Sequence, residues 1–514
     1  MSFWKKNGLL FVVFLTGAAV LVVEVLAVRI LSPYYGNTIF TVSGVLSVIL
    51  AALSVGYYIG GRLADKHPSE KLFFGIILVS GLLVLLLQLF TVILLPALGH
   101  KLSMASGPLV SSLFMFFLPG FLLGMLSPFT IKLQQMRLPD QGVGTISGRI
   151  FFWSTLGSIV GSLLTGFVFI PHLGVNEILI YTGVVLVLLG LLPILKIGLS
   201  KATAAQVILV VFLISAATTG IVASERYDDN VVYVKDGIYQ KIIIYDTEDE
   251  EGRPVRVMQQ DRSPSSAMFL DSDDLVFEYS KYYPMYQFFT PEIKETLIIG
   301  GAAYSIPKVL LEDVEDITVD VVEIEPSLYE LSQQYFRLPN DPRLNNYVED
   351  GRRFLANSEK NYDLIFGDAY YSRYSIPAHL TTKEFFQLAK EKLTPGGIFM
   401  GNFLGNFNDS APSILLSEIK TFLEVFPNSY YIATQKQDFD DYQNVVFIGY
   451  NSDQKIDFND LAIREHLNPI ISNVGEHLVD INSLDLEEHI LFTDNYAPVD
   501  YLTSKAIKNT KTSE

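Results

Sequence analysis

The first part of the chain is a series of long apolar stretches, whereas the remainder alternates over shorter periods. A helix that spans a membrane needs about 20 mostly apolar residues. Seven stretches qualify, at 8–28, 38–61, 72–97, 109–133, 151–170, 177–195 and 204–222. Glycines recur four residues apart within them, at Gly56/Gly60, Gly120/Gly124 and Gly157/Gly161. Such spacing lets helices pack closely in lipid. The pattern predicts a multi-pass α-helical membrane bundle of about seven spans over 1–222.

The pattern after residue 222 is that of a globular protein with two kinds of sheet. Residues 229–260 alternate as short antiparallel strands do. From 295 onward the order strand, turn, helix repeats, which predicts a doubly wound parallel sheet. We expect its strands at 296–299, 318–323, 363–366 and 398–402, and helices near 305–312, 326–336, 351–357 and 382–392. The predicted domains are therefore the bundle (1–222), a small β-strand subdomain (223–290) and an α/β Rossmann-like domain (291–514).

Charge divides the chain at the same place. Residues 1–222 hold 12 Lys/Arg and 5 Asp/Glu, whereas 223–514 hold 25 and 50. A single soluble domain is excluded, and so is a nucleic-acid binder that relies on phosphate contacts, because the acidic part would repel a polyanion. The chain has no cysteine, which excludes disulfides, thiolate metal sites and cysteine nucleophiles.

Basic residues on the short loops predict the orientation of the bundle. Ten lie in the amino terminus and the loops at 62–71, 132–149 and 196–201, whereas the opposite loops hold only Arg29 and Lys101. The positive-inside rule then places the amino terminus in the cytoplasm. Seven spans would put the carboxyl-terminal domain outside the cell membrane, and an even number would put it in the cytoplasm. The charge bias favours the outside, and the side stays open.

One acid lies deep in an apolar stretch. Glu24 is inside the first predicted span. An ionisable group at membrane depth is a functional hypothesis by default, and a hydrogen bond within the bundle is the alternative.

Acids follow neighbouring predicted strands at the edge where a parallel sheet binds its ligand. The first strand ends in Gly300-Gly301, and Glu323 ends the second strand 23 residues after Gly300. Asp350-Gly351 precedes a short helix, and Asp368 follows the next strand. Small residues at the first turn let a ligand approach the backbone, and an acid about 20 residues on suits a ribose diol. The pattern predicts a nucleoside site with a polar or cationic edge.

The region from about 229 to 450 resembles the spermidine synthase family, which has the class I S-adenosylmethionine-dependent transferase fold. The matching motifs are Tyr239-Gln240, Gly300-Gly301, Val322 to Pro326, Glu349-Asp350-Gly351 and Tyr362 to Asp368. The preceding helices resemble those of membrane-embedded members, and the tail at 491–500 resembles their closing motif. The resemblance implies a nucleoside and an amine as ligands, with decarboxylated S-adenosylmethionine or S-adenosylmethionine as cofactor and no metal.

The resemblance also implies a role for each matching residue. Gln240 would contact the nucleoside, next to the Gly300-Gly301 turn, and Glu323 would bind the ribose hydroxyls. Asp350 and Gly351 would flank the adenine. Asp368 would border the reacting centre as the catalytic residue.

Three positions depart from the family pattern. Ala303 stands where an aspartate would hold the aminopropyl amine, and Tyr371 where a second aspartate would take the proton of the attacking amine. Ser265 stands where a glutamine is expected. A diamine must be held as a cation and then deprotonated, and carboxylates do both. The substitutes that the sequence offers are Tyr279, Tyr370, Tyr371 and His379, of which Tyr279 and Tyr371 are the predicted substrate-binding residues. A tyrosine ring binds a cation, although its pKa of about 10 makes it a poor base.

Three functions stay open. The first is a membrane-bound aminopropyltransferase, and the second is a methyltransferase acting on a membrane-delivered substrate, which the loss of the amine-holding aspartate affects less. The third is a transporter or scaffold with a degenerate nucleoside-binding domain. The expected partners are a small-molecule nucleoside and amine, the lipid bilayer and possible copies of the same chain in a homo-oligomer, but no nucleic acid.

Overall fold

The computed structural model describes residues 3–99, 101–197, 206, 209, 213, 216, 230–290, 292–369, 376–439, 442–452 and 455–510. The chain divides into two compact units, Met1–Tyr227 and Asp228–Glu514. Each unit is described by itself below.

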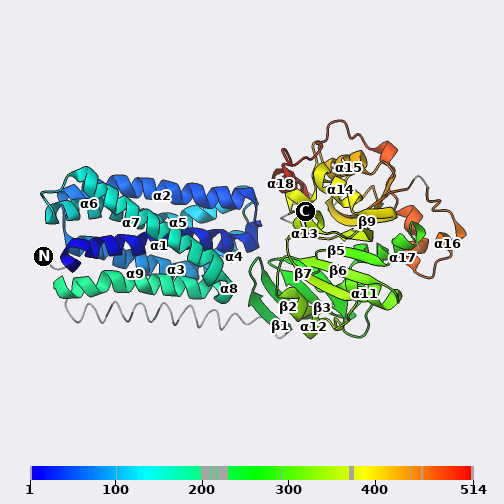
Figure 1. Ribbon diagram of the computed structural model, residues 1–514, viewed down its shortest axis with the longest axis horizontal. Helices are drawn as coiled ribbons and strands as arrows, with labels where there is room; N and C mark the ends of the chain where they lie inside the picture. Colours follow the sequence, from blue (N-terminus) through cyan, green and yellow to red (C-terminus); the bar gives the residue numbers. More distant parts are fainter. Residues whose placement is uncertain are drawn as a thin grey trace. The chain divides into compact units, whose positions relative to one another are not determined.

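The first unit is entirely helical in its described residues (Figure 1). Its α-helices are α1 (Phe3–Tyr35), α2 (Ile39–Lys66), α3 (Glu70–Leu89), α4 (Leu95–Gly99), α5 (Gly107–Gly124), α6 (Leu126–Arg137), α7 (Val143–Leu164), α8 (Ile170–His172) and α9 (Val175–Ile197). Short π-helical turns at Phe90–Leu94 and Thr165–Phe169 continue α3 and α7.

Six helical segments of the described residues are long and apolar enough to cross a membrane, compared with the seven expected. They are Asn7–Tyr35, Ile39–Lys66, Glu70–Leu89, Gly107–Arg137, Val143–His172 and Val175–Ile197. These six correspond to the first six predicted spans. The seventh, 204–222, lies almost entirely outside the described residues. The count of spans is therefore corrected to about six, and the prediction of an outside domain, which needs an odd count, loses its support from the described helices.

The predicted close packing at glycine is confirmed. The helices pack mainly in the pairs α1/α7, α2/α5 and α3/α9. A Cβ atom on Gly157 would lie 2.0 Å from the carbonyl oxygen of Phe14, and one on Gly56 would lie 2.3 Å from that of Phe121. Any larger residue at these two positions would force the helices apart.

The second unit contains two sheets (Figure 1). The smaller one is antiparallel, in the order β1 (Val231–Asp236), β2 (Lys241–Glu248), β3 (Pro254–Gln260), β4 (Ser263–Phe269). The larger one has the order β10-β11-β9-β8-β5-β6-β7. Its strands are β5 (Glu295–Ile299), β6 (Thr318–Glu323), β7 (Leu344–Val348), β8 (Tyr362–Gly367), β9 (Leu393–Gly405), β10 (Ser429–Ala433) and β11 (Gln443–Tyr450).

The larger sheet is doubly wound, as predicted. Strands β5 to β9 are parallel, and β11 pairs antiparallel with β9 and β10. The α-helices of this unit are α11 (Ser305–Asp313), α12 (Leu328–Tyr335), α13 (Gly351–Asn357), α14 (Lys383–Glu391), α15 (Ile414–Val425), α16 (Leu461–Arg464), α17 (Pro469–Ser472) and α18 (Val499–Thr510). Short 3₁₀ helices lie at Glu278–Phe288, Ala378–Leu380, Val474–Glu476 and Ile481–Ser483. The predicted membrane bundle followed by an α/β domain with a small β-strand subdomain is the fold observed.

The two faces of the larger sheet have separate cores. Alternate residues of a strand point to opposite faces, so Leu297 and Ile299 join an aromatic core with α14 and α15, whereas Ile298 joins the core on the other face. That second core also contains Ile242 and Ile244 of β2. The small sheet is thereby fixed against the larger one, close to the carboxyl ends of β5 and β6.

Candidate active site

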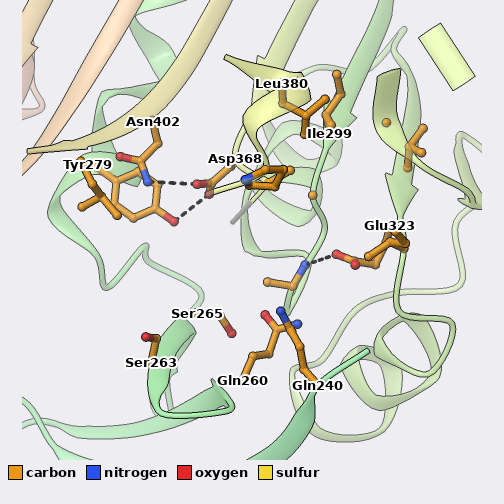
Figure 2. A pocket seen from close by; sticks show the side chains of 18 of the residues that line it. Gln240, Gln260, Ser263, Ser265, Tyr279, Ile299, Glu323, Asp368, Leu380 and Asn402 are labelled. Carbon is orange, nitrogen blue, oxygen red and sulfur yellow. Dashed lines mark hydrogen bonds between the residues drawn. The ribbon is translucent and has the colours of Figure 1, made fainter. Parts of the chain in front are cut away.

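A cavity of about 360 Å³ lies at the carboxyl ends of β5, β6 and β8 (Figure 2). In open α/β sheets this edge is where ligands bind. The cavity collects most of the residues that the sequence singled out: Gln240, Tyr279, Gly300, Glu323, Asp350, Gly351 and Asp368. They come from separate elements spread over 129 positions of sequence, and the topology brings them together.

The turn after β5 is built around Gly300. This residue has a φ of +95°, and a Cβ atom on it would lie 2.5 Å from the carbonyl oxygen of Asp368. Only glycine adopts this conformation without strain and leaves room for the neighbouring strand end. The turn therefore sets the spacing between the β5 and β8 sides of the cavity.

Glu323 holds this turn from the end of β6. Its Oε2 accepts hydrogen bonds from the backbone N–H groups of Gly301 at 2.8 Å and Ala302 at 3.2 Å, and its Oε1 accepts one from Glu325 at 3.0 Å. Burial raises the pKa of Glu323, and these backbone donors act in the opposite direction. Glu323 lines the cavity, whereas Gly301 lines a smaller cavity that shares Gly300 and Asp368 with it.

The small sheet supplies the next wall. Gln240 and Gln260 line the cavity with Ser263 and Ser265 (Figure 2). The carboxylate of Glu325 accepts a hydrogen bond from the N–H of Tyr239 at 2.8 Å. This contact ties the β1–β2 hairpin to the segment that follows Glu323, so Gln240 is held at the cavity wall.

Asp350 begins α13 as its N-cap. Its Oδ1 accepts a hydrogen bond from the N–H of Arg353 at 2.9 Å, and its Oδ2 lies 2.7 Å from Nε2 of His379. The hydrogen bond with His379 lowers the pKa of Asp350. Gly351 approaches β5 so closely that a Cβ atom would lie 2.3 Å from Cγ2 of Ile299.

Two donors converge on Asp368 at the end of β8. The hydroxyl of Tyr279 donates to its Oδ2 at 2.7 Å, and the amide of Asn402 donates to its Oδ1 at 3.0 Å (Figure 2). The carbonyl of the Asn402 amide in turn accepts a hydrogen bond from Asn444 at 2.8 Å. Desolvation raises the pKa of Asp368 to about 7, although both donors lower it. A carboxylate with this pKa can accept a proton near neutral pH.

The substitutes that the sequence offered for the missing carboxylates lie in different places. Tyr279 donates to Asp368, whereas His379 bonds to Asp350. Tyr370 and Tyr371 lie outside the described residues. Ala303 is buried, with 2% of its surface exposed, and is absent from the cavity wall.

Sequence reasoning missed Gln260, Asn402 and Asn444, all of which line the cavity. Asn402 ends a predicted strand, and this position was the signal by which the sequence could have indicated it as a site residue. In the described part of the chain, no cluster of three or more His, Asp or Glu is arranged to hold a metal ion.

Comparison with known proteins bears on the same region. A family model for the spermine/spermidine synthase domain matches residues 282–434. The chain is spermidine synthase-like in this region. The match includes the glycine turn, Glu323, Asp350, Asp368 and Asn402.

Individual relatives differ in how much of the chain they cover. A polyamine aminopropyltransferase of Streptococcus pneumoniae serotype 4 is 32% identical over 169 residues, which are 32% of this chain and 57% of that protein. Polyamine aminopropyltransferase 1 of Streptomyces coelicolor is 25% identical over 414 residues, which are 76% of this chain and 75% of that protein. Because Asp228–Glu514 is just over half of the chain, the second match must include part of the helical unit.

Among solved structures, a probable spermidine synthase from Corynebacterium glutamicum has 20% identity and a TM-score of 0.44. The match covers 52% of this chain and 98% of that chain.

Proposed function

We propose that the protein is a membrane-bound transferase that moves the aminopropyl group of decarboxylated S-adenosylmethionine to an amine. The observation that carries the proposal is Asp368, a carboxylate with a pKa of about 7 placed in the same cavity as the predicted nucleoside residues. The spermidine synthase-like match supports the choice of reaction class.

The reaction requires little covalent chemistry from the protein. The amine nitrogen attacks the propyl carbon next to the sulfonium, a C–N bond forms, the C–S bond breaks, and methylthioadenosine leaves as a neutral thioether. The proton lost by the amine passes to Asp368. Catalysis is then mainly orientation of the two substrates, with one base positioned beside the nitrogen.

The nucleoside would lie along the β5–β6 edge. Glu323 would accept hydrogen bonds from the ribose hydroxyls. Asp350 and Gly351 would flank the adenine, and Gln240 would contact the nucleoside from the β1–β2 hairpin. The Glu323 carboxylate already accepts hydrogen bonds from the backbone N–H groups of Gly301 and Ala302, and it would accept a further one from a ribose hydroxyl.

The acceptor would lie beyond Asp368. A small side cavity there shares Tyr279 and Asp368 with the main one, and its described polar wall is otherwise made of serines: Ser265, Ser266, Ser280 and Ser305. Asp368 is the one charged side chain among these described lining residues. The side cavity, at about 30 Å³, is too small for a diamine. We expect a diamine to be a poor acceptor because Ala303 and Tyr371 stand where the family pattern has carboxylates.

A methyltransferase is the second candidate, and Ala303 favours it. The family pattern has its amine-holding aspartate at this position, and methyl transfer loses less by its absence because no aminopropyl amine has to be held. Supplying the full-length protein with each cofactor separates the two: aminopropyl transfer releases methylthioadenosine, and methyl transfer releases S-adenosylhomocysteine. Exclusive formation of the second product would replace the first proposal with the second.

Nucleoside binding tests the assignment of Glu323 without turnover. We expect Glu323→Ala to weaken methylthioadenosine binding in titration calorimetry by at least about tenfold, because a charged hydrogen-bond acceptor is lost. Equal affinities would remove Glu323 from the site. No binding by the wild-type protein would favour the degenerate domain.

A further inference from the structure

The tail at 490–494 packs against α14 and α15. The N–H of Ile490 donates to Oγ of Ser417 at 3.1 Å, and the N–H of Phe492 donates to Oγ1 of Thr421 at 2.9 Å. The carbonyl of Phe492 accepts a hydrogen bond from the N–H of Lys383 at 2.9 Å. Phe492 is fully buried. The tail therefore has a defined register against α14 and α15.

This register places Asp494 against Arg352. The two guanidinium nitrogens Nη1 and Nη2 of Arg352 donate to Oδ1 and Oδ2 of Asp494, both at 2.6 Å. Oδ1 also accepts a hydrogen bond from Thr382 at 2.8 Å, and the N–H of Asp494 donates to Glu384 at 2.9 Å. A two-pronged pair of this kind fixes the orientation of the guanidinium plane as well as its position.

Arg352 connects the tail to the cavity. It follows Gly351 at the start of α13, and its Nη1 also donates to the carbonyl of His379 at 3.1 Å. The imidazole of His379 lies 2.7 Å from Oδ2 of Asp350. Both His379 and Asp350 line the cavity. A continuous series of hydrogen bonds thus runs from Asp494 through Arg352 and His379 to Asp350.

We propose that Asp494 is a positioning residue for the nucleoside site, acting through Arg352 and His379 on the carboxylate of Asp350. The proposal rests on the proposed nucleoside-binding function. The tail at 491–500 has no part in the chemistry described above. Its role here is to fix the 377–382 segment, which carries His379. Without Asp494, Arg352 keeps its hydrogen bond to the His379 carbonyl but loses the partner that orients it.

The first experiment measures methylthioadenosine binding to the full-length protein in nanodiscs by calorimetry. Asp494→Asn should raise the dissociation constant about five- to tenfold, because a charge-assisted pair is lost. The matched control is Asp246→Asn, which removes a two-pronged pair with Arg256 (2.7 and 2.9 Å) whose residues are outside the cavity wall. This control should leave the affinity unchanged. Wild-type affinity in Asp494→Asn would overturn the proposal.

A double-mutant cycle separates positioning from general support of the fold. If Asp494 acts through His379, then Asp494→Asn should change the affinity less than about twofold in a His379→Ala background. Fully additive effects of the two substitutions would overturn the proposal, because Asp494 would then act by another route.

Hydrogen exchange tests the connection even when no nucleoside binds. The N–H groups of Leu380 and Thr381 bond to the carbonyls of Pro377 and Ala378. Both amides should exchange faster in Asp494→Asn and at the wild-type rate in Asp246→Asn. Unchanged exchange would overturn the connection from the tail to His379. Faster exchange in a protein that binds no methylthioadenosine would mean that the proposed function has failed while the connection stands.

Discussion

At the scale of single residues, the environment of Asp368 decides what the cavity can do. Desolvation favours the protonated carboxyl, and hydrogen bonds from Tyr279 and Asn402 favour the ionised form. The balance leaves the pKa at about 7. Because folding raises this pKa above that of the unfolded chain, the group contributes stability at low pH that is lost as the pH rises through about 7. Ionised Asp368 thus lowers the stability of the folded chain at neutral pH and can act as a base at that pH.

Activity should follow the ionisation of Asp368. The value of kcat/KM should rise as the pH increases through about 7 and then stay level, because only the ionised carboxylate accepts the proton. Tyr279→Phe removes a donor to the ionised form, so the midpoint should move to higher pH. Tyr283→Phe is the control, because Tyr283 donates to Asp313 from the same 3₁₀ helix outside the cavity. An unshifted midpoint in Tyr279→Phe would separate this tyrosine from the base.

Putrescine should be a poor acceptor. Ala303 and Tyr371 stand where the spermidine synthase pattern has carboxylates that bind one amine and deprotonate the other. We expect turnover with decarboxylated S-adenosylmethionine and putrescine below the ordinary enzymatic range of about 1–10³ s⁻¹. Initial rates of methylthioadenosine release measure this directly. A rate within that range would show that the missing carboxylates are not needed.

At the scale of elements, the site is a set of strand ends brought to one edge. Strands β5, β6, β8 and β9 were predictable because each is an apolar run followed by glycine or an acid. β7 was missed because Leu344–Val348 contains two asparagines, which are uncommon in strands. Asn402 and Asn444 could not be connected from sequence, because their contact depends on the antiparallel pairing of β11 with β9. The alternation of residues along the sequence identifies a strand but does not show which other strand it pairs with.

The β5 turn should tolerate no side chain at Gly300. Gly300→Ala adds a clash with the Asp368 carbonyl to the cost of a positive φ, whereas Gly252 has a φ of +81° in open space. We expect Gly252→Ala to lower the free energy of unfolding by about 1 kcal/mol and Gly300→Ala by about 2–3 kcal/mol. Urea titration of both variants measures the difference. Equal losses would mean that the neighbouring strand end moves away at no cost.

At the scale of the whole molecule, one chain combines a helical unit with a transferase-like unit. The match to the Streptomyces coelicolor relative extends into the helices, so the two units are found together in that protein as well. The side of the membrane on which Asp228–Glu514 lies depends on the stretch 204–222. If this stretch is a seventh span, the charge rule places the domain outside; if the bundle has six spans, the rule places the domain in the cytoplasm. An outside domain would need the bundle to deliver nucleoside or amine, and Glu24 would then have a role.

Protease treatment of intact spheroplasts determines the side. The six spans of the described helices predict that 228–514 is protected until lysis, whereas 204–222 as a seventh span predicts cleavage before lysis. Protection until lysis, with a protease shown to be active, would place the domain in the cytoplasm, on the same side as its proposed cofactor. Cleavage before lysis would contradict the count of six spans.

The most direct test of the account follows the transferred group itself. Full-length protein in nanodiscs is incubated with decarboxylated S-adenosylmethionine labelled in its propyl carbons and with a panel of monoamines and diamines, and the products are identified by mass spectrometry. The account predicts that label appears in an amine together with an equal amount of methylthioadenosine. It also predicts that Asp368→Asn reduces this transfer by about 10²–10⁴-fold while methylthioadenosine still binds. Label that stays in the nucleoside with every amine, although methylthioadenosine binds, would contradict the account.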